Sequence, residues 1–533
     1  MTLSRSPLSP ERRWLLIFAL ATMALLTLPY GLGFARQGAD WRFTGFLFGV
    51  EDGNNYIAKM QRGANGDYLF RTPYTAYPQR GVFANFPYLL LGKLSPVPAS
   101  HDWLVTLYHA FRFAAGIAMI FAVYDFIALF IRDVKWRRWG IVLTTWGGGL
   151  GWLLFLFGRS TLFGNLPLEF YSPESFGFLS LYGIPHLAMA RALLFWGLAA
   201  YLRVETPPWK AGLLWLLMGL FQPLDIPLVW ALIAVHLSLL ALWNLWQSRR
   251  GAADWARWRR WVTRALWAGA VSAPLAVYTW WAFAADPVLR QWKWTRSQNH
   301  SPHPVHFLLA YGLLLPLAFW KLPRIWKAGR PKQLWLLAWV LAFPLLVYAP
   351  IDMQRRLAEG FWVALVTLAL FTLQSWPQPR AQRWRWLFLP AFLSTLILLT
   401  STALGALTPS GPLFRPAGET AAFEHLNATA DNQSVVLSAY ETGNPLPAWA
   451  PVFVVIGHGP ESVHLEELSP RVAAFYQPGT PDSRRLALLD EFGVDFVFRG
   501  PVERALGDWN PAEAEYLSLV FQQGGYEIYR VNR

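Results

Sequence analysis

The sequence predicts a mainly α-helical protein that crosses a membrane many times. Three observations support this fold class. The chain of 533 residues is 54% hydrophobic and 16% aromatic but only 15% charged, which differs strongly from an average soluble protein. Several segments of about 18 or more residues carry almost no charge, enough to cross about 30 Å of hydrocarbon as a helix. Short segments rich in Lys and Arg separate these apolar segments.

The apolar segments predict about eleven membrane spans. Eight are long and uninterrupted: residues 14–34, 103–131, 139–157, 184–202, 262–284, 333–349, 360–375 and 386–406. A ninth is expected at 306–320. Residues 209–246 begin and end beside basic segments, so they must cross twice. In "FQPLDIP", Pro223, Asp225 and Pro227 supply the break between the two helices.

The net charge of +14 belongs to the segments between the apolar runs. Besides Arg12 and Arg13, these segments are 132–138, 203–210, 247–264, 321–332 and 378–385. They form no single stripe with aromatic residues for base stacking, so no nucleic-acid partner is predicted. The positive-inside rule places all of them in the cytoplasm. We therefore expect a multi-pass protein of the cell (plasma) membrane with a cytoplasmic N-terminus and an extracytoplasmic C-terminus.

Two further observations limit the interpretation. A secretory signal is the alternative for residues 14–34, and either interpretation leaves the next loop outside. The chain contains no Cys, which excludes disulfides, thiolate nucleophiles and Cys-based metal sites.

Four regions are predicted to face the outside. They are a first loop at 35–102, loops at 158–183 and 285–305, and the tail 407–533. We expect two domains: a transmembrane domain over residues 1–406, which includes the first loop, and a small extracytoplasmic α/β domain over the tail.

The first loop contains two segments with the pattern of amphipathic helices. Residues 54–65 carry apolar side chains at helical spacing, with polar side chains opposite. The apolar set is Tyr56, Ile57 and Met60, and the polar set is Lys59, Gln61 and Arg62. Residues 83–94 suggest a second such helix. Both are expected to lie along the membrane surface.

The tail has short β-like segments and one helical segment. The predicted strands are 434–440, 451–459, 494–500 and 526–531, and a helix is predicted over 480–493 with a Gly just past its end. "GHGPES" (457–462) lacks the glycine spacing of a P-loop or dinucleotide fingerprint. We interpret it as a turn after a strand, with a phosphate-binding turn as the alternative.

Ionisable residues within predicted spans cost at least about 2.5 kcal/mol each, so they require partners, water or a function. Arg112, Arg191 and Asp225 are such residues. Two interpretations stay open: they pair to fix helix packing, or they line a polar cavity open to the outside.

Arg355 and Arg356 are adjacent on a predicted outside turn. Two guanidinium groups suit a phosphate, which they can hold by bidentate charge-assisted hydrogen bonds. The alternatives are anionic lipid headgroups, or the neighbouring Asp352 and Glu359.

His300, His303 and His306 recur at every third residue with prolines between them. A polyproline helix has three residues per turn, so all three imidazoles would share one face. That face could ligate a metal or protonate a phosphate leaving group. The alternative is an ordinary surface loop.

The stretch "GVEDGNNYIAKMQRGANGDYLF" (49–70) contains the adjacent carboxylates Glu51 and Asp52. An acidic residue before a short helix can cap its N-terminus, which is one interpretation. The pattern continues with Tyr56, Gly66-Asp67-Tyr68, and Pro87 opening a later apolar helix. It resembles the first extracytoplasmic loop of the GT-C superfamily of integral-membrane glycosyltransferases, in particular protein O-mannosyltransferases and aminoarabinose transferases.

The sequence departs from the family pattern in three ways, one of which is that Gly53-Asn54-Asn55 follows the acidic pair. The pair is Glu-Asp where many members have Asp-Glu, so the resemblance leaves open which carboxylate is catalytic. Tyr68 replaces a Trp.

The resemblance implies a GT-C-like fold and an inverting hexosyl- or pentosyltransferase with a polyprenyl-phosphate-sugar donor. Asp52 would be the general base, and Glu51 would orient the acceptor or a divalent metal (Mg²⁺ or Mn²⁺). The donor phosphate would be held by Arg355 and Arg356, with Arg112 or His303. Candidates for a further carboxylate near the acceptor are Glu169, Glu174 and Asp67. From other classes, a multi-span transporter and a non-catalytic envelope-assembly protein are the alternatives.

Overall fold

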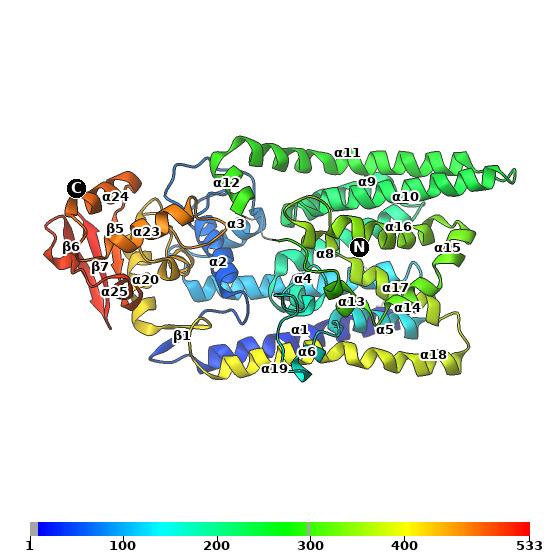
Figure 1. Ribbon diagram of the computed structural model, residues 1–533, viewed down its shortest axis with the longest axis horizontal. Helices are drawn as coiled ribbons and strands as arrows, with labels where there is room; N and C mark the ends of the chain where they lie inside the picture. Colours follow the sequence, from blue (N-terminus) through cyan, green and yellow to red (C-terminus); the bar gives the residue numbers. More distant parts are fainter. Residues whose placement is uncertain (1–8, 296–298, 533) are drawn as a thin grey trace, which may run out of the picture. The chain divides into compact units, whose positions relative to one another are not determined.

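The structure is a computed structural model that describes residues 9–295 and 299–532. Residues 296–298 of the expected loop 285–305 therefore lie outside the described part. The chain forms two compact units (Figure 1). Unit 1 is built from Met1–Thr27, Phe111–Thr279 and Gln298–Ser401, and unit 2 from Leu28–Ala110, Trp280–Ser297 and Thr402–Arg533.

Unit 1 is helical. Its helices, including four that continue into unit 2, are α1 (Pro10–Arg36), α4 (His101–Ile127), α5 (Val134–Trp146), α6 (Leu153–Leu156), η1 (Leu168–Phe170), α7 (Phe178–Gly183), α8 (Pro185–Leu202), α9 (Pro208–Phe221), α10 (Asp225–Ser248), α11 (Trp255–Ala285), α13 (Val305–Tyr311), α14 (Leu315–Trp320), α15 (Leu322–Ala328), α16 (Pro331–Val347), η2 (Gln354–Ala358), α17 (Phe361–Leu373), α18 (Gln378–Trp384), η3 (Arg385–Phe392) and α19 (Leu393–Leu407).

The protein is a multi-pass membrane protein. Among the described residues, five helices are long and apolar enough to cross a membrane. They are Pro10–Arg36, His101–Ile127, Asp225–Ser248, Gln354–Leu373 and Gln378–Leu407. The count becomes six if α13 and the helices after it, bent by 83°, form one span, and α9 and α16 are shorter apolar helices. The total of eleven spans stays a prediction.

The helix breaks follow the local sequence. The predicted break in "FQPLDIP" is present, because α9 ends at Phe221 and α10 begins at Asp225. The expected helix over 139–157 was wrong in its second half, since α5 ends at Trp146 before three consecutive glycines. Glycine loses more conformational entropy in a helix than any other residue, which disfavours continuation there.

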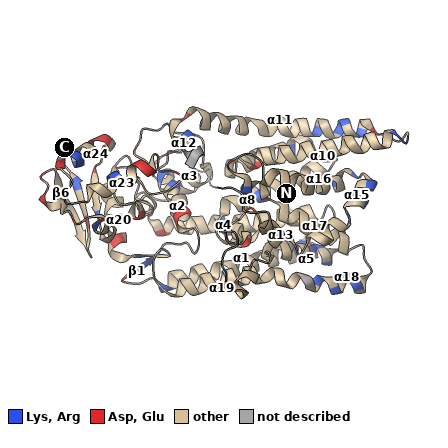
Figure 2. Cartoon of the chain, in the orientation of Figure 1, with Lys and Arg blue, Asp and Glu red and all other residues tan. Residues whose placement is uncertain are grey.

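Basic residues of unit 1 gather at the ends of α10, α11, α15 and α18, as Figure 2 shows. The predicted basic segments 247–264, 321–332 and 378–385 are the sequence of those ends. Their common position is what the positive-inside rule requires.

Unit 2 combines the first loop with the tail. Its helices are α2 (Val50–Ala64), α3 (Phe86–Gly92), α12 (Pro287–Thr295), α20 (Ala417–Thr429), α21 (Tyr440–Gly443), α22 (Leu446–Trp449), α23 (Leu465–Phe475), α24 (Asp482–Phe492), α25 (Pro501–Leu506) and η4 (Pro511–Glu513). Its strands are β1 (Trp41–Phe43), β2 (Phe414–Pro416), β3 (Val435–Leu437), β4 (Phe453–Val454), β5 (Phe496–Arg499), β6 (Leu517–Gln523) and β7 (Tyr526–Val531).

The five-stranded sheet of the tail has the order β4-β3-β5-β7-β6. Strand β3 is parallel to β4 and β5, whereas β7 is antiparallel to β5 and β6. All four predicted strands are present. Strand β6 was not predicted, because only its first residue, Leu517, is buried and the strand lacks a clear alternation. The predicted helix is α24, and Gly493 ends it with a φ of 58°.

The first loop and the tail share one core. Strand β1 pairs with β2, so that Phe43 lies opposite Phe414. Ile57 and Met60 of α2 belong to the same buried cluster as Val436 of β3. The tail is therefore packed together with the first loop, and the division at residue 406 does not describe this unit.

The two predicted loop helices are present as α2 and α3, but the expected exposure of the polar face of α2 was wrong. Lys59, Gln61 and Arg62 are 2%, 0% and 1% exposed. The tail covers them: Lys59 pairs with Glu461, and Gln61 donates to the carbonyl of Trp449. Sequence periodicity could not reveal a second buried face, because its polar residues are satisfied by distant partners.

Candidate functional site

The acidic pair lies in the first turn of α2. The helix begins after Gly49, which has a φ of 55°, and no side-chain hydrogen bond caps it. The N-cap interpretation of the pair is therefore wrong, although negative charge in a first turn still complements the helix dipole. Both Glu51 and Asp52 are exposed, and the Asp52 side chain retains 66% of its accessible surface.

Glu51 is held by the tail. The Tyr440 hydroxyl donates a hydrogen bond to the Glu51 carboxylate, and the backbone N–H of Gly459 lies 3.5 Å from the same oxygen. The Gly459 N–H also donates to the Tyr440 hydroxyl at 2.8 Å. Burial and the neighbouring Glu51 raise the pKa of Tyr440, so the phenol keeps its proton at neutral pH.

Asp52 faces a histidine of the tail. The Asp52 Oδ1 atom lies 3.4 Å from Nε2 of His458, whose ring is buried. The same Nε2 lies 3.4 Å from Nδ2 of Asn55, one turn further along α2. His458 is part of the "GHGPES" turn, and the Ser462 hydroxyl accepts hydrogen bonds from the N–H groups of Gly457 and His458.

A buried ion pair lies beneath the acidic pair. Glu461 accepts hydrogen bonds from Lys59 at 3.0 Å, Asn55 at 2.7 Å and Thr72 at 2.6 Å. Burial by itself would raise the pKa of Glu461, but Lys59, His458 and the hydrogen bonds outweigh burial and lower this pKa to about 2. The turn is thus anchored to α2 by a charged carboxylate.

Tyr440, His458 and Glu461 were not among the predicted site residues. The "GHGPES" turn was interpreted as a simple turn after a strand, and the structure shows that it is also the contact to the acidic pair. The available signal was a histidine between two glycines after an apolar strand.

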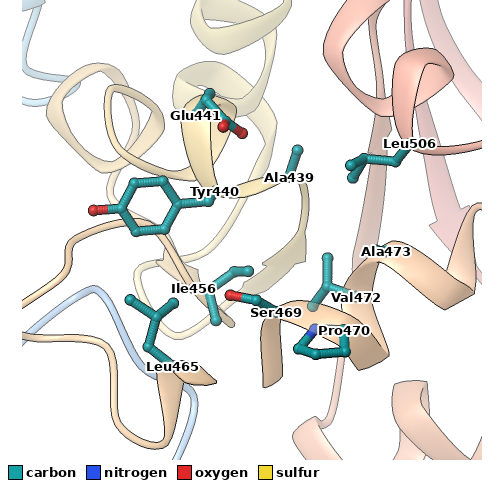
Figure 3. Close-up of a pocket in the computed structure, with 10 residues that line it drawn as sticks. All are labelled: Ala439, Tyr440, Glu441, Ile456, Leu465, Ser469, Pro470, Val472, Ala473 and Leu506. Atoms are coloured by element: carbon teal, nitrogen blue, oxygen red, sulfur yellow. The ribbon is translucent and has the colours of Figure 1, made fainter. Parts of the chain in front are cut away.

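A cavity of about 550 Å³ lies beside Tyr440 within the tail (Figure 3). Its walls are mostly apolar, with Glu441 and Ser469 as the polar side chains. Figure 3 shows the ring of Tyr440 at the wall and its hydroxyl pointing away from the cavity.

Asp67 is not part of this group. About 18 Å of helix α2 separates it from Asp52. Its carboxylate is paired with Arg62 at 2.8 Å and with Arg71 at 3.3 Å.

The two arginines of unit 1 that were predicted to lie within spans have internal partners. Arg191 forms a two-point ion pair with Glu359, with Nη2 to Oε2 at 2.8 Å, and both are 2% exposed. Arg112 is fully buried and donates to the Thr27 hydroxyl at 2.8 Å and to the Leu181 carbonyl at 3.3 Å. For these two residues the packing interpretation holds. Asp225 is buried as well.

Arg355 and Arg356 come together with Glu174 and Tyr171 in unit 1. The Arg355 guanidinium lies 4.6 Å from the Tyr171 ring centre and donates to the Asn299 amide oxygen at 2.8 Å. Arg356 Nε lies 3.8 Å from Glu174 Oε1. In the described part of the chain, the ion pair of Arg356 is with Glu174 and that of Glu359 is with Arg191, rather than between the arginine pair and Asp352 or Glu359.

Glu169 is buried and forms hydrogen bonds within unit 1. It is 5% exposed, and its Oε1 accepts hydrogen bonds from the Gly151 N–H at 2.6 Å and the Ser394 hydroxyl at 3.0 Å. Burial raises the pKa of this carboxyl. Glu169 thus holds the glycine-rich turn after α5.

The three histidines do not share one face. His306 lies in helix α13 and is buried, with its Nε2 2.8 Å from the Leu162 carbonyl. His303 is exposed and packs against Phe163 with 4.4 Å between ring centres. The polyproline prediction was wrong because Pro304 begins a helix at this point.

No metal-ligand set is evident in the described part of the chain, where no three His, Asp or Glu side chains gather. The carboxylate oxygens of Glu51 and Asp52 are of the type that Mg²⁺ prefers. In this structure these carboxylates contact Tyr440, Gly459 and His458.

No protein-family model matches the sequence, and no curated protein matches it. The structure is similar to ArnT from Cupriavidus metallidurans in the apo state, with a TM-score of 0.52 and 12% identity over 96% of this chain and 97% of that chain. ArnT bound to undecaprenyl phosphate gives a TM-score of 0.51 and 12% identity, with 97% of each chain covered.

A third similar structure is the oligosaccharyltransferase of Archaeoglobus fulgidus, tethered with an acceptor peptide. Its TM-score is 0.51 at 12% identity, over 96% of this chain and 74% of that chain. The chain has a GT-C fold. The structural similarity extends over nearly all of the chain, whereas the sequence resemblance was confined to the first loop. The GT-C prediction is therefore confirmed at the level of the fold.

Proposed function

We propose that this protein is an inverting membrane glycosyltransferase that transfers a sugar from a polyprenyl-phosphate donor to an acceptor hydroxyl. The observation that carries the proposal is the exposed Asp52 carboxylate in the first turn of α2, on a chain with a GT-C fold. The proposal covers hexose and pentose donors alike.

Asp52 is the general base in this proposal. A base must reach the proton it removes, and Asp52 exposes 66% of its side chain. The Glu51 Oε1 atom already accepts a hydrogen bond from the Tyr440 hydroxyl and lies 3.5 Å from the Gly459 nitrogen, so this oxygen is directed toward the tail. Glu51 therefore has the role of anchoring and orienting, and Asp52 takes the proton.

The reaction is a single displacement at the anomeric carbon. The acceptor oxygen forms a bond to that carbon as its proton passes to Asp52. The bond between the carbon and the phosphate oxygen breaks, and its electron pair leaves with the polyprenyl phosphate. Attack from the face opposite the leaving group inverts the anomeric centre.

Unit 1 supplies the candidate donor-phosphate site. Arg355 and Arg356 are half-buried cations, and guanidinium groups stabilise a phosphate that gains charge as it leaves. Arg112 is a weaker candidate, because it is buried and donates to Thr27 and Leu181. His303 is exposed and stays a candidate. ArnT, which has the same fold, was crystallised with undecaprenyl phosphate.

The proposed orientation follows from the basic ends of the unit 1 helices. The positive-inside rule places those ends in the cytoplasm, and the spans predicted from the sequence then make the first loop and the tail extracytoplasmic, so sugar transfer takes place on that side of the cell membrane in this proposal. The transporter alternative loses support, because the buried Arg191 and Arg112 have internal partners.

The test uses the purified full chain in lipid nanodiscs. A panel of radiolabelled undecaprenyl-phosphate hexoses and pentoses is offered with a membrane extract as acceptor. Wild-type protein is expected to transfer label from at least one donor. Asp52→Asn should lower the rate by about 10²- to 10⁴-fold, the usual contribution of a general base.

Asp490→Asn, at an exposed position of α24, is the matched control and should transfer label at the wild-type rate. Full transfer by Asp52→Asn would remove Asp52 from the mechanism. Wild-type protein that transfers no sugar from any donor of the panel would contradict the proposed function.

A further inference from the structure

The tail places a buried imidazole directly against the proposed base. We propose that His458 is a positioning residue for Asp52: its Nε2–H donates to Oδ1 and fixes the orientation of the carboxylate that takes the proton of the acceptor hydroxyl. The catalytic consequence rests on the proposed function, whereas the His458–Asp52 contact can be tested without it.

The position of His458 is fixed on several sides. The ring is 3% exposed although Asp52 itself is open to solvent. Its backbone N–H donates to the Ser462 hydroxyl at 3.1 Å. Its ring packs on Tyr74 with 5.3 Å between ring centres. A rigid buried donor can fix the rotamer of an exposed carboxylate at small entropic cost.

The polar neighbours of Nε2 decide what the imidazole does. Nε2 lies 3.4 Å both from Asp52 Oδ1 and from Asn55 Nδ2. Asn55 must present its amide nitrogen on this side, because that nitrogen donates to Glu461 Oε1 at 2.7 Å. With a proton on Nε2, the imidazole donates to Asp52. Without that proton it accepts from Asn55, and its lone pair faces the carboxylate.

The charge of Asp52 therefore selects the tautomer. An anionic Asp52 favours the Nε2–H form, since a carboxylate is repelled by a lone pair. Once Asp52 has taken the acceptor proton, the attraction weakens and Nε2 is free to exchange partners. The imidazole neither gains nor loses a proton overall: the acceptor proton stays on the Asp52 carboxyl group until it passes to water.

The other ionisable groups around His458 do not compete with its contact to Asp52. Lys59 and Glu461 neutralise one another in a buried ion pair at 3.0 Å. Tyr440 and Tyr74 stay protonated, since burial raises the pKa of both phenols. The charged group that contacts Nε2 is Asp52, whose Oδ1 lies 3.4 Å away.

Isosteric variants separate positioning from a merely structural role. The amide nitrogen of Gln reaches the place of Nε2, whereas that of Asn reaches the place of Nδ1. His458→Asn should lower kcat by about tenfold or more, because a misplaced base loses its alignment, with the KM for the donor within about twofold of wild type. His458→Gln should recover most of the lost rate. His425→Asn in α20 is the matched control, and all variants should keep the wild-type Tm.

A spectroscopic measurement tests the contact independently of sugar transfer. The full chain, labelled with ¹⁵N-histidine in nanodiscs, should show His458 as the Nε2–H tautomer, assigned by the signal that His458→Gln removes. Asp52→Asn should shift that signal, and Asp490→Asn should leave it unchanged.

The outcomes separate the two proposals. An Nδ1–H tautomer, or a signal unaffected by Asp52→Asn, would overturn the positioning role, and so would wild-type kcat in His458→Asn. The expected tautomer and shift, together with a wild-type chain that transfers no sugar, would support the contact and contradict the glycosyltransferase proposal.

Discussion

Two groups of ionisable side chains in this protein differ in their exposure. In unit 1, Arg191 and Glu359 are each 2% exposed and satisfy one another, with the Phe176 and Pro173 carbonyls as further acceptors for the guanidinium. In unit 2, Asp52 is 66% exposed and lies beside the imidazole of His458. A buried ion pair whose members satisfy one another, here called a closed pair, has no hydrogen-bonding capacity left for a substrate. An exposed carboxylate, here called an open carboxylate, can contact one.

The comparison shows how the structure around an exposed carboxylate is held in place. Beneath Asp52 and Glu51, unit 2 has its own closed pair, Lys59 with Glu461, which anchors the "GHGPES" turn to α2. Closed pairs thus serve architecture in both units. Breaking a buried pair leaves an uncompensated charge, which is far more unfavourable than the loss of an exposed pair.

The largest expected effect is the loss of the closed pair in unit 1. Arg191→Met leaves the Glu359 carboxylate buried without its cation, and we expect the free energy of unfolding to fall by about 3–5 kcal/mol. Thermal and denaturant unfolding of the purified chain in detergent would measure it. Arg191→Met combined with Glu359→Leu removes both charges and should be less destabilised than the single variant. A double variant as unstable as Arg191→Met would show that the two residues do not act as a pair.

The closed pair in unit 2 predicts a pH dependence. The folded-state pKa of Glu461 is about 2, below the ordinary value of 4.5. Between these values the unfolded chain binds the proton and the folded chain does not, so stability rises with pH. This contribution is fully present above about pH 4.5 and is lost as the pH falls toward 2.

The measurement is the Tm of the full chain from pH 6 to pH 3. Glu461→Gln should lower the Tm at pH 6, because Lys59 loses its partner, and should flatten the dependence below pH 4.5. Glu466→Gln, at an exposed position of α23, is the matched control and should keep the wild-type slope. An unchanged slope in Glu461→Gln would assign the acid sensitivity to other carboxylates.

Much of the fold was predictable, because apolar length and turn chemistry are local properties. The break before Asp225, the strands of the tail and helix α24 with its terminal Gly493 follow from nearby residues. The acidic pair was also found from the sequence, since two adjacent carboxylates in an apolar chain are conspicuous.

The partners of the acidic pair could not be predicted. Tyr440 and His458 follow Glu51 and Asp52 by about 400 residues, and only the folding of the tail onto the first loop brings them together. For the same reason the polar face of α2 was taken to be exposed, because the sequence does not record that Glu461 covers Lys59.

The smallest expected effect concerns Arg355, a partly exposed cation of unit 1. Arg355 is half-buried over Tyr171 and donates one hydrogen bond to Asn299, so its guanidinium has donors to spare for a phosphate. A charge-assisted hydrogen bond contributes about 1.5–3 kcal/mol, so Arg355→Ala should weaken the binding of undecaprenyl phosphate by about ten- to a hundredfold. Binding to the purified chain by fluorescence or calorimetry would measure this change. Arg13→Ala, at an exposed position of α1, controls for the loss of one positive charge and should bind the lipid as wild type does. Equal affinities for Arg355→Ala and Arg13→Ala would show that Arg355 does not bind the donor phosphate and that other residues do.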